Sequence, residues 1–336
     1  YKGQKYEKAV VTKIIKDNLA EDGSRYGTQK VLVKMTTGTY KGKEKQAINP
    51  SGTLFGADCK VGARIIVIVN KSGTNVGFTV YSQDRTMAIY GFALIFAAVV
   101  CAIGGKKGVY AILSLVFAFA CIIGIMFPMM YRGISPIVLT IIVAVLTTIV
   151  TLGLLGGYSS KTVSAILGTA IGVVIAAVAA MAFGKAAGIT GYNVSDIEAL
   201  NYVGQNTKIK IGELLFAGII ISALGAVMDV GMSIASTIQE IYETDKTLSM
   251  KRLFVSGINV GRDMMGTMTN TLIFAYVGGA MTTLVINYAY DLSYRQLANS
   301  YVIGIEIMQG LSGSLGVVLT VPITALIASF LAVRKK

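Results

Sequence analysis

The stretch TVSAILGTAIGVVIAAVAAMAFG (residues 162–184) decides the fold class of this chain, because it holds 23 residues without a charged side chain. A helix of about 20 apolar residues crosses the roughly 30 Å hydrocarbon layer of a bilayer. One such run could also be a core helix of a soluble protein. Seven largely apolar runs follow one another, at 87–103, 108–127, 135–154, 162–184, 213–238, 266–286 and 311–333. The sequence therefore predicts a polytopic α-helical membrane protein with seven visible spans.

The composition also indicates lipid as the main solvent. The 336-residue chain is 54% hydrophobic and only 14% charged, whereas about a quarter of the residues in a soluble domain are charged. Its net charge of +13 is typical of a membrane protein whose Lys and Arg residues set its topology. We therefore expect the lipid bilayer as its partner and no nucleic acid.

The charges are concentrated at the N-terminus. Residues 1–86 hold 15 of the 30 Lys and Arg residues and 7 of the 17 Asp and Glu residues. Apolar and polar residues alternate there as in half-buried strands. The candidate strands are 7–16, 29–37, 39–48, 63–70 and 75–83. Five short strands predict a small barrel of the OB type, so we expect a β-rich domain over 1–84 and a transmembrane helical domain over 85–336.

The distribution of Lys and Arg between the joints predicts the orientation. With the β-rich domain outside, ten cationic residues lie at cytoplasmic joints and five at outer joints. Cytoplasmic loops carry the excess of Lys and Arg. We therefore expect an extracytoplasmic β-rich domain and a cytoplasmic C-terminus. A further helix before Tyr1 would bring the total to eight spans.

The absence of histidine excludes several kinds of catalytic site. The chain has no His, which rules out Ser-His-Asp triads, Cys-His pairs and zinc sites that need imidazole. The Gly104–Gly108 turn lacks the P-loop pattern. We expect neither an enzyme nor a bound metal or cofactor.

Asp229 is the one charge between Leu214 and Ile238 in the fifth run. Charged residues inside spans are costly and mark functional sites by default. Residues at steps of three or four share a helix face, and Asp229 belongs to such a polar or small-residue stripe. The stripe is Ser222, Gly225, Asp229, Ser233, Ser236 and Glu240.

Polar residues also cluster at the start of the sixth run and before the last one. Glu306 precedes the last run at its outer side. In the cluster at the start of the sixth run, four residues share one helix face: Asn259, Asp263, Thr267 and Asn270. Arg262 and Asp263 are expected near the inner boundary of the membrane. The members of the whole cluster are Asn259, Arg262, Asp263, Thr267 and Asn270.

Three interpretations of these polar residues stay open. Asp229 could be the titrating group of a proton or cation relay, with Asp263, Arg262 and Glu306 as further candidates. It could instead form an ion pair with Arg262 that locks neighbouring helices. It could also be protonated and donate a hydrogen bond to another helix.

Three motifs resemble the YibE/F family of bacterial membrane proteins. They are GAVMDVGMSIAS (225–236), GINVGRDMMGTMTNTL (257–272) and GLSGSLGVVLTVPITA (310–325). The resemblance extends over the soluble domain and all the runs. It implies a membrane fold and a bacterial plasma-membrane location, and it carries no activity.

A more distant similarity is to the SecD and SecF subunits and to RND-type permeases. Those proteins resemble this chain in a carboxylate-bearing helix, a following helix that ends in Gly-Gly, and a last helix with Ser and Pro. Two extra spans and the barrel are departures from that pattern. The similarity implies a permease built from two related halves, and hence a homo-oligomer or a paired paralogous subunit.

Two functional hypotheses follow. The first is an ion- or proton-coupled transporter with a relay at Asp229 and Asp263. The second is a non-transporting scaffold or envelope assembly factor, which binds a partner through the β-rich domain.

Overall fold

The computed structural model describes residues 4–19, 27–50, 56–72, 75–194 and 196–334. The chain separates into two compact units, residues 1–99 and 100–336. The division falls inside the first long helix, beyond the predicted boundary at residue 84.

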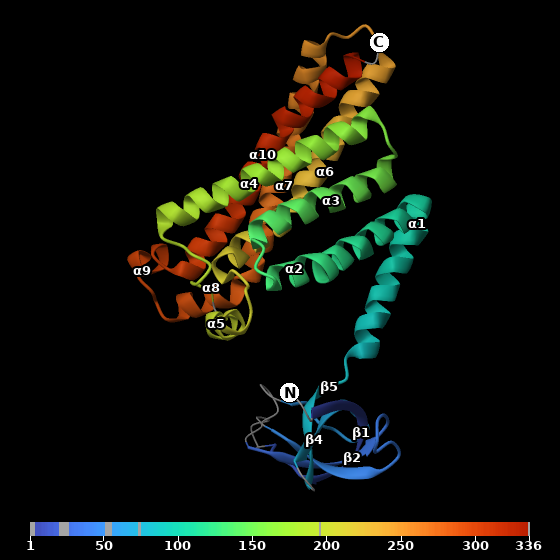
Figure 1. Cartoon of the computed structure of the whole chain (residues 1–336), viewed down its shortest axis with the longest axis vertical. Coiled ribbons are helices and arrows are strands. Elements are labelled where there is room, and N and C mark those ends of the chain that lie inside the picture. The colour runs from blue at the N-terminus through green and yellow to red at the C-terminus, as the bar shows by residue number, and fades with distance from the viewer. Residues whose placement is uncertain (1–3, 20–26, 51–55, 73–74, 195, 335–336) are drawn as a thin grey trace. The chain divides into compact units, whose positions relative to one another are not determined.

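The described N-terminal residues form a closed five-stranded barrel (Figure 1). The strands pair in the order β1-β2-β3-β5-β4, with β3 parallel to β5 and the other pairs antiparallel. This crossed order is compatible with a Greek-key barrel. The strands are β1 (Gln4–Lys16), β2 (Gln29–Met35), β3 (Glu44–Asn49), β4 (Arg64–Ser72) and β5 (Asn75–Gln83). The predicted five-stranded barrel is confirmed, although the third strand begins at Glu44 because residues 39–43 form a turn.

Alternation of side chains builds the core of the barrel. Val31, Val33 and Met35 of β2 are buried, while Lys30 and Lys34 next to them along the strand are exposed. Successive side chains of a strand point to opposite faces, so one face of each strand supplies the core.

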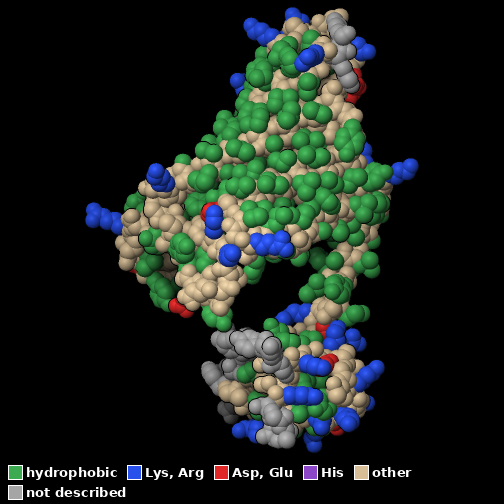
Figure 2. Space-filling model, viewed as in Figure 1, with side chains coloured by type: hydrophobic (Ala, Val, Ile, Leu, Met, Phe, Trp, Pro, Cys, Tyr) green, Lys and Arg blue, Asp and Glu red, His purple; other side chains and the backbone are tan. Residues whose placement is uncertain are grey.

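The rest of the chain is helical. Its elements are α1 (Thr86–Cys121), the π-helical turn η1 (Ile122–Met126), α2 (Phe127–Tyr131), α3 (Pro136–Gly156), α4 (Ser160–Ala187), α5 (Ile197–Asn206), the 3₁₀ turn η2 (Ile211–Glu213), α6 (Leu214–Thr244), α7 (Met250–Gly279), α8 (Met281–Ala289), α9 (Tyr294–Ala298) and α10 (Tyr301–Val333). Hydrophobic side chains cover the visible sides of the long helices (Figure 2). Such a surface fits lipid rather than water.

Among the described residues, five helical segments are long and apolar enough to cross a membrane, or up to six if the bent pair α7–α8 is one span. The count of seven spans is therefore not confirmed. The first two predicted runs lie in one helical segment, Thr86–Tyr131, although Gly105 within it is non-helical with φ 53° and ψ −131°. The sixth run crosses the 59° bend between α7 and α8.

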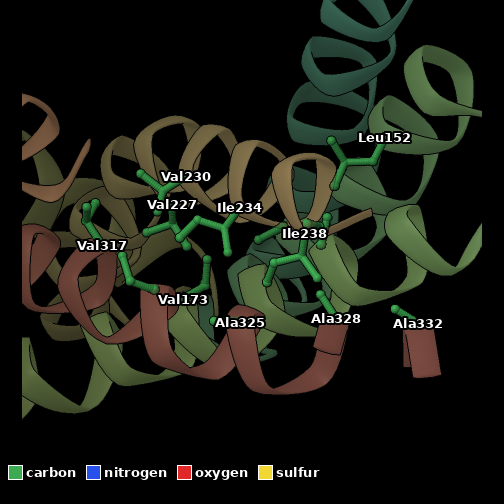
Figure 3. Packing of buried hydrophobic residues seen from close by; sticks show 14 of the residues in the cluster. Leu152, Val173, Val227, Val230, Ile234, Ile238, Val317, Ala325, Ala328 and Ala332 are labelled. Atoms are coloured by element: carbon green, nitrogen blue, oxygen red, sulfur yellow. The ribbon is translucent and has the colours of Figure 1, made fainter. Parts of the chain in front are cut away.

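The core of the helical unit lies between α3, α4, α6 and α10 (Figure 3). Val173 of α4, Val227 and Ile234 of α6, and Val317 of α10 are at most 1% exposed. Small residues allow α4 and α10 to approach closely. A Cβ atom at Gly168 or Gly172 would collide with Thr324 or Thr320 of α10, so this glycine pair permits the close helix contact.

Candidate functional site

Helix α6 buries its apolar side and leaves its polar side uncovered. Val227, Val230 and Ile234 are fully buried in the core. On the other side Ser222 and Asp229 are exposed. Polar groups of a span normally face the interior of the bundle or a water-filled path, so α6 has the reverse of the arrangement expected for a lipid-facing helix.

Helix α7 continues this arrangement. Its small and apolar residues Gly257, Gly261 and Leu272 are buried, whereas all five polar residues predicted for the site are exposed. We call the uncovered residues of both helices the polar face. It comprises Ser222, Gly225, Asp229, Ser233 and Ser236 of α6, of which the last two are half-buried, and Asn259, Arg262, Asp263, Thr267 and Asn270 of α7.

Contacts between α6 and α7 fix their register. The Tyr276 hydroxyl donates a hydrogen bond of 2.8 Å to the Ser222 hydroxyl. Farther along the pair, an added Cβ at Gly261 would lie 3.2 Å from the Ile234 side chain. The two helices therefore run antiparallel, and Asp229 is level with the turn of α7 around Thr267.

The Asp229 carboxylate has no partner within the described part of the chain. Ion pairs there join Lys8 to Asp84, Lys60 to Asp58 and Lys210 to Glu213, and none joins Asp229 to Arg262. The interhelical lock considered from the sequence is thus not formed within one chain. An unpaired carboxylate can take up a proton or bind a cation.

Glu306 lies apart from these residues, at the start of α10. It is half-buried and lines a largely apolar cavity of about 330 Å³. Ligand pockets typically begin at about this size and have mostly apolar walls. The walls come from α7, α8 and α10, and include Tyr276, Val277, Ala280, Leu284 and Ile303. Because Tyr276 also bonds Ser222, one hydrogen bond joins the wall of this cavity to the polar face.

Sequence reasoning did not single out Tyr276. A tyrosine in an apolar run counts as hydrophobic, so only its contacts reveal the link. Four hydroxyls inside the bundle were also not predicted as a group, and they lack hydrogen-bond partners among the described residues. They belong to Thr169, Ser314, Thr324 and Ser329. In the same described part, no three His, Cys, Asp or Glu side chains are placed to hold a metal ion.

Comparison with known proteins places the helical part of the chain in a family. The family model described as YibE/F-like protein matches residues 92–334, which include all three sequence motifs and the whole polar face. The barrel lies before the matched residues. No curated protein and no solved structure matches the chain, and the likeness to SecD and SecF is not shown. The match covers well over half of the chain, so this protein belongs to the YibE/F-like family.

Proposed function

We propose that this membrane protein is an ion- or proton-coupled transporter, with Asp229 as its relay group and Asp263 as a second carboxylate on the path. The observation that carries the proposal is an unpaired carboxylate at mid-helix in an apolar span, within the polar face. A charge at the centre of a span costs about 3 kcal/mol on insertion scales. A residue that only packs against neighbouring helices can be uncharged, so it would not carry this insertion cost.

The transporter acts as an assembly of at least two membrane subunits. Within one chain the polar face lies open, and lipid is a poor solvent for Arg262, Asp263 and Asp229. A second copy or a paralogous subunit placed there converts the open face into an enclosed polar path. The cavity that Glu306 lines then lies at one end of that path. The hydrogen bond between Tyr276 and Ser222 connects the cavity wall to the path.

The bacterial plasma membrane is the proposed location, with the barrel outside and the C-terminus in the cytoplasm. This orientation places Lys106 and Lys107 on the cytoplasmic side, as the positive-inside rule requires. A cysteine at Lys106 should therefore react with a membrane-impermeant reagent only after the cells are opened. Labelling in intact cells would reverse the orientation.

Ion flux in proteoliposomes tests the relay. The protein is reconstituted with a pH gradient or a sodium gradient, and flux is followed with a pH-sensitive dye or with radioactive sodium. We expect Asp229→Asn to reduce the flux at least tenfold, because the amide neither titrates nor carries a charge. Asp229→Glu should keep a measurable flux.

Glu240→Gln is the matched control. Glu240 lies on the same helix face, beyond the apolar stretch, and is exposed. Its substitution removes one carboxylate and should leave the flux within twofold. Equal flux in the wild type and in Asp229→Asn, or no ion flux in the wild type, contradicts the relay.

The separate barrel favours a second candidate function, that of a scaffold which binds an envelope component. The barrel has its own buried core and an exposed basic surface. Under this function Asp229→Asn is nearly silent, while loss of the barrel is disabling. Growth phenotypes of the two variants would distinguish the candidates.

A further inference from the structure

The barrel is joined to the first apolar helix without a linker. Strand β5 ends at Gln83 and α1 begins at Thr86. The chain covers at most about 10 Å in total between these two residues. From Thr86 to Gly105 the helix has no charged residue. The apolar surface therefore begins directly at the end of the barrel.

Hydrogen bonds at Asp84 fasten this joint. The Asp84 backbone N–H donates to the Arg64 carbonyl at 2.9 Å, and its carboxylate accepts from the Thr86 N–H at 3.1 Å. The same carboxylate pairs with Lys8 of β1 at 3.1 Å. Strands β1 and β4 and the start of α1 thus meet at Asp84. This arrangement restricts how far the barrel can rotate relative to the start of the helix.

Four exposed cations lie on segments that adjoin Lys8 and Asp84. Lys41 and Lys43 lie on the turn between β2 and β3. The Met35 N–H donates to the Lys43 carbonyl and closes this turn, and the Thr36 N–H donates to the Lys8 carbonyl and attaches the turn to β1. Arg64 begins β4 beside Asp84. We call Lys41, Lys43, Arg64 and Arg85 the collar; all four side chains are exposed, and none forms an ion pair with another described residue.

The described carboxylates at this end mostly have partners. Asp84 pairs with Lys8, and Glu7 accepts a hydrogen bond from Thr37. Glu44 lies opposite Lys34 in the strand register. The collar therefore leaves an excess of positive charge, and Figure 2 shows Lys and Arg side chains over the visible face of the barrel. The exposed apolar side chain of Val61 lies on the loop that leads to Arg64.

We propose that the collar docks onto anionic phospholipid headgroups of the bilayer that α1 enters, so that the barrel rests on the membrane surface. Lys and Arg close to an anionic bilayer each gain about 1 kcal/mol, which corresponds to about fivefold in the docked-to-undocked ratio. Water would solvate these cations equally well at either end of the barrel. Their position around the start of the span favours the headgroups. The inference goes beyond transport and does not depend on it.

Fluorescence quenching in vesicles tests the docking with the full chain. Val61→Cys carries a fluorophore in a chain whose Cys101 and Cys121 are replaced by serine, and Cys59 is fully buried. Lipids with a nitroxide on the headgroup act as quenchers. Vesicles consist of phosphatidylcholine alone or with phosphatidylglycerol. We expect stronger quenching with phosphatidylglycerol, and a loss of that difference at high salt.

Two matched triple variants locate the effect. Lys41→Gln, Lys43→Gln and Arg64→Gln together should remove the phosphatidylglycerol-dependent quenching. Lys5→Gln, Lys30→Gln and Lys71→Gln remove the same charge far from the joint and should preserve it. Hydrogen exchange of the barrel amides confirms that both variants are folded.

Three outcomes would overturn the proposal. The first is equal quenching in both kinds of vesicle, and the second is an equal loss in both triple variants. The third is displacement of the barrel by soluble polyphosphate at matched ionic strength, which would identify a soluble polyanion as the occupant. Ion flux in the collar variant is expected to persist, so failure of the docking and failure of the relay are separable.

Discussion

Asp84 is the residue at which strand, helix and charge pair meet. Hydrogen bonds from Thr86 and from Lys8 lower the pKa of its carboxyl from the ordinary value of 3.8 to about 2. The side chain is only 7% exposed by surface area. The joint described above is therefore built around an ionised group.

Acid should weaken this joint in a defined pH window. Because the folded pKa of Asp84 lies below its unfolded value, its contribution to stability is complete above about pH 4 and is lost between about pH 4 and pH 2. Asp84→Asn should lower stability at neutral pH by about 1–3 kcal/mol and flatten the change below pH 4. Thermal unfolding of the barrel, followed by tyrosine circular dichroism, measures both. An unchanged acid profile in Asp84→Asn would contradict the assignment.

Asn49 holds a second polar contact inside the barrel. Its side-chain nitrogen donates to Gln29 at 2.9 Å and to the Ala57 carbonyl at 2.6 Å, and both side chains are fully buried. Asn49→Ala leaves these groups unsatisfied and should cost about 1–3 kcal/mol. Asn70→Ala, on the exposed surface of β4, should stay within about 0.5 kcal/mol. Hydrogen exchange of barrel amides compares the two, and equal losses would refute the network's role.

Residue periodicity made part of the site predictable. Steps of three and four placed Asp229 with Ser222, and the structure leaves both on one exposed face. The same reasoning did not reveal Tyr276, since a hydroxyl at the edge of an apolar ring does not disturb hydropathy. It also did not show that Glu306 lies on a cavity, which depends on the bend after α7.

At the scale of helices, the α4–α10 contact depends on the absence of side chains. A Cβ at Gly172 would collide with the Thr320 hydroxyl and lie 2.8 Å from Val227, both rigidly placed in the core. Gly172→Ala should therefore destabilise the bundle by about 1–3 kcal/mol. Gly218→Ala on α6, where no atom lies within 4 Å, is the control and should be neutral or slightly stabilising. Thermal aggregation in detergent ranks the variants, and equal midpoints would contradict close packing.

The helix boundaries show where hydropathy ceases to be informative. Apolar runs give the existence of spans, because lipid demands them. They do not show whether Gly105 separates two spans or bends one, since that depends on backbone angles. Hydropathy begins the sixth run at residue 266 because the first half of α7 is polar, whereas the helix itself begins at Met250 and includes the polar residues.

At the scale of the molecule, the proposed second subunit must cover both signs of charge. Arg262 is positive, while Asp263 and Asp229 are negative, so the face can complement itself. A two-fold dimer brings the same patch of two copies together. Gly225 of this face and the exposed Gly266 next to Thr267 have no atom within 4 Å of an added Cβ, which leaves room for a close helix contact.

Charge reversal should therefore act differently in single and double variants. Arg262→Asp and Asp263→Arg should each weaken self-association at least about tenfold, or 1.4 kcal/mol, because like charges then face each other. The double variant restores opposite charges in both copies and should recover the dimer. Single-molecule photobleaching in liposomes counts the subunits.

The double variant also separates the two kinds of partner. A paralogous subunit keeps its own charges, so the double variant would remain defective against it. A wild-type chain that is monomeric in liposomes would instead mean that no second copy covers the polar face. Recovery in the double variant is expected only if Arg262 and Asp263 of one copy lie against the same residues of another.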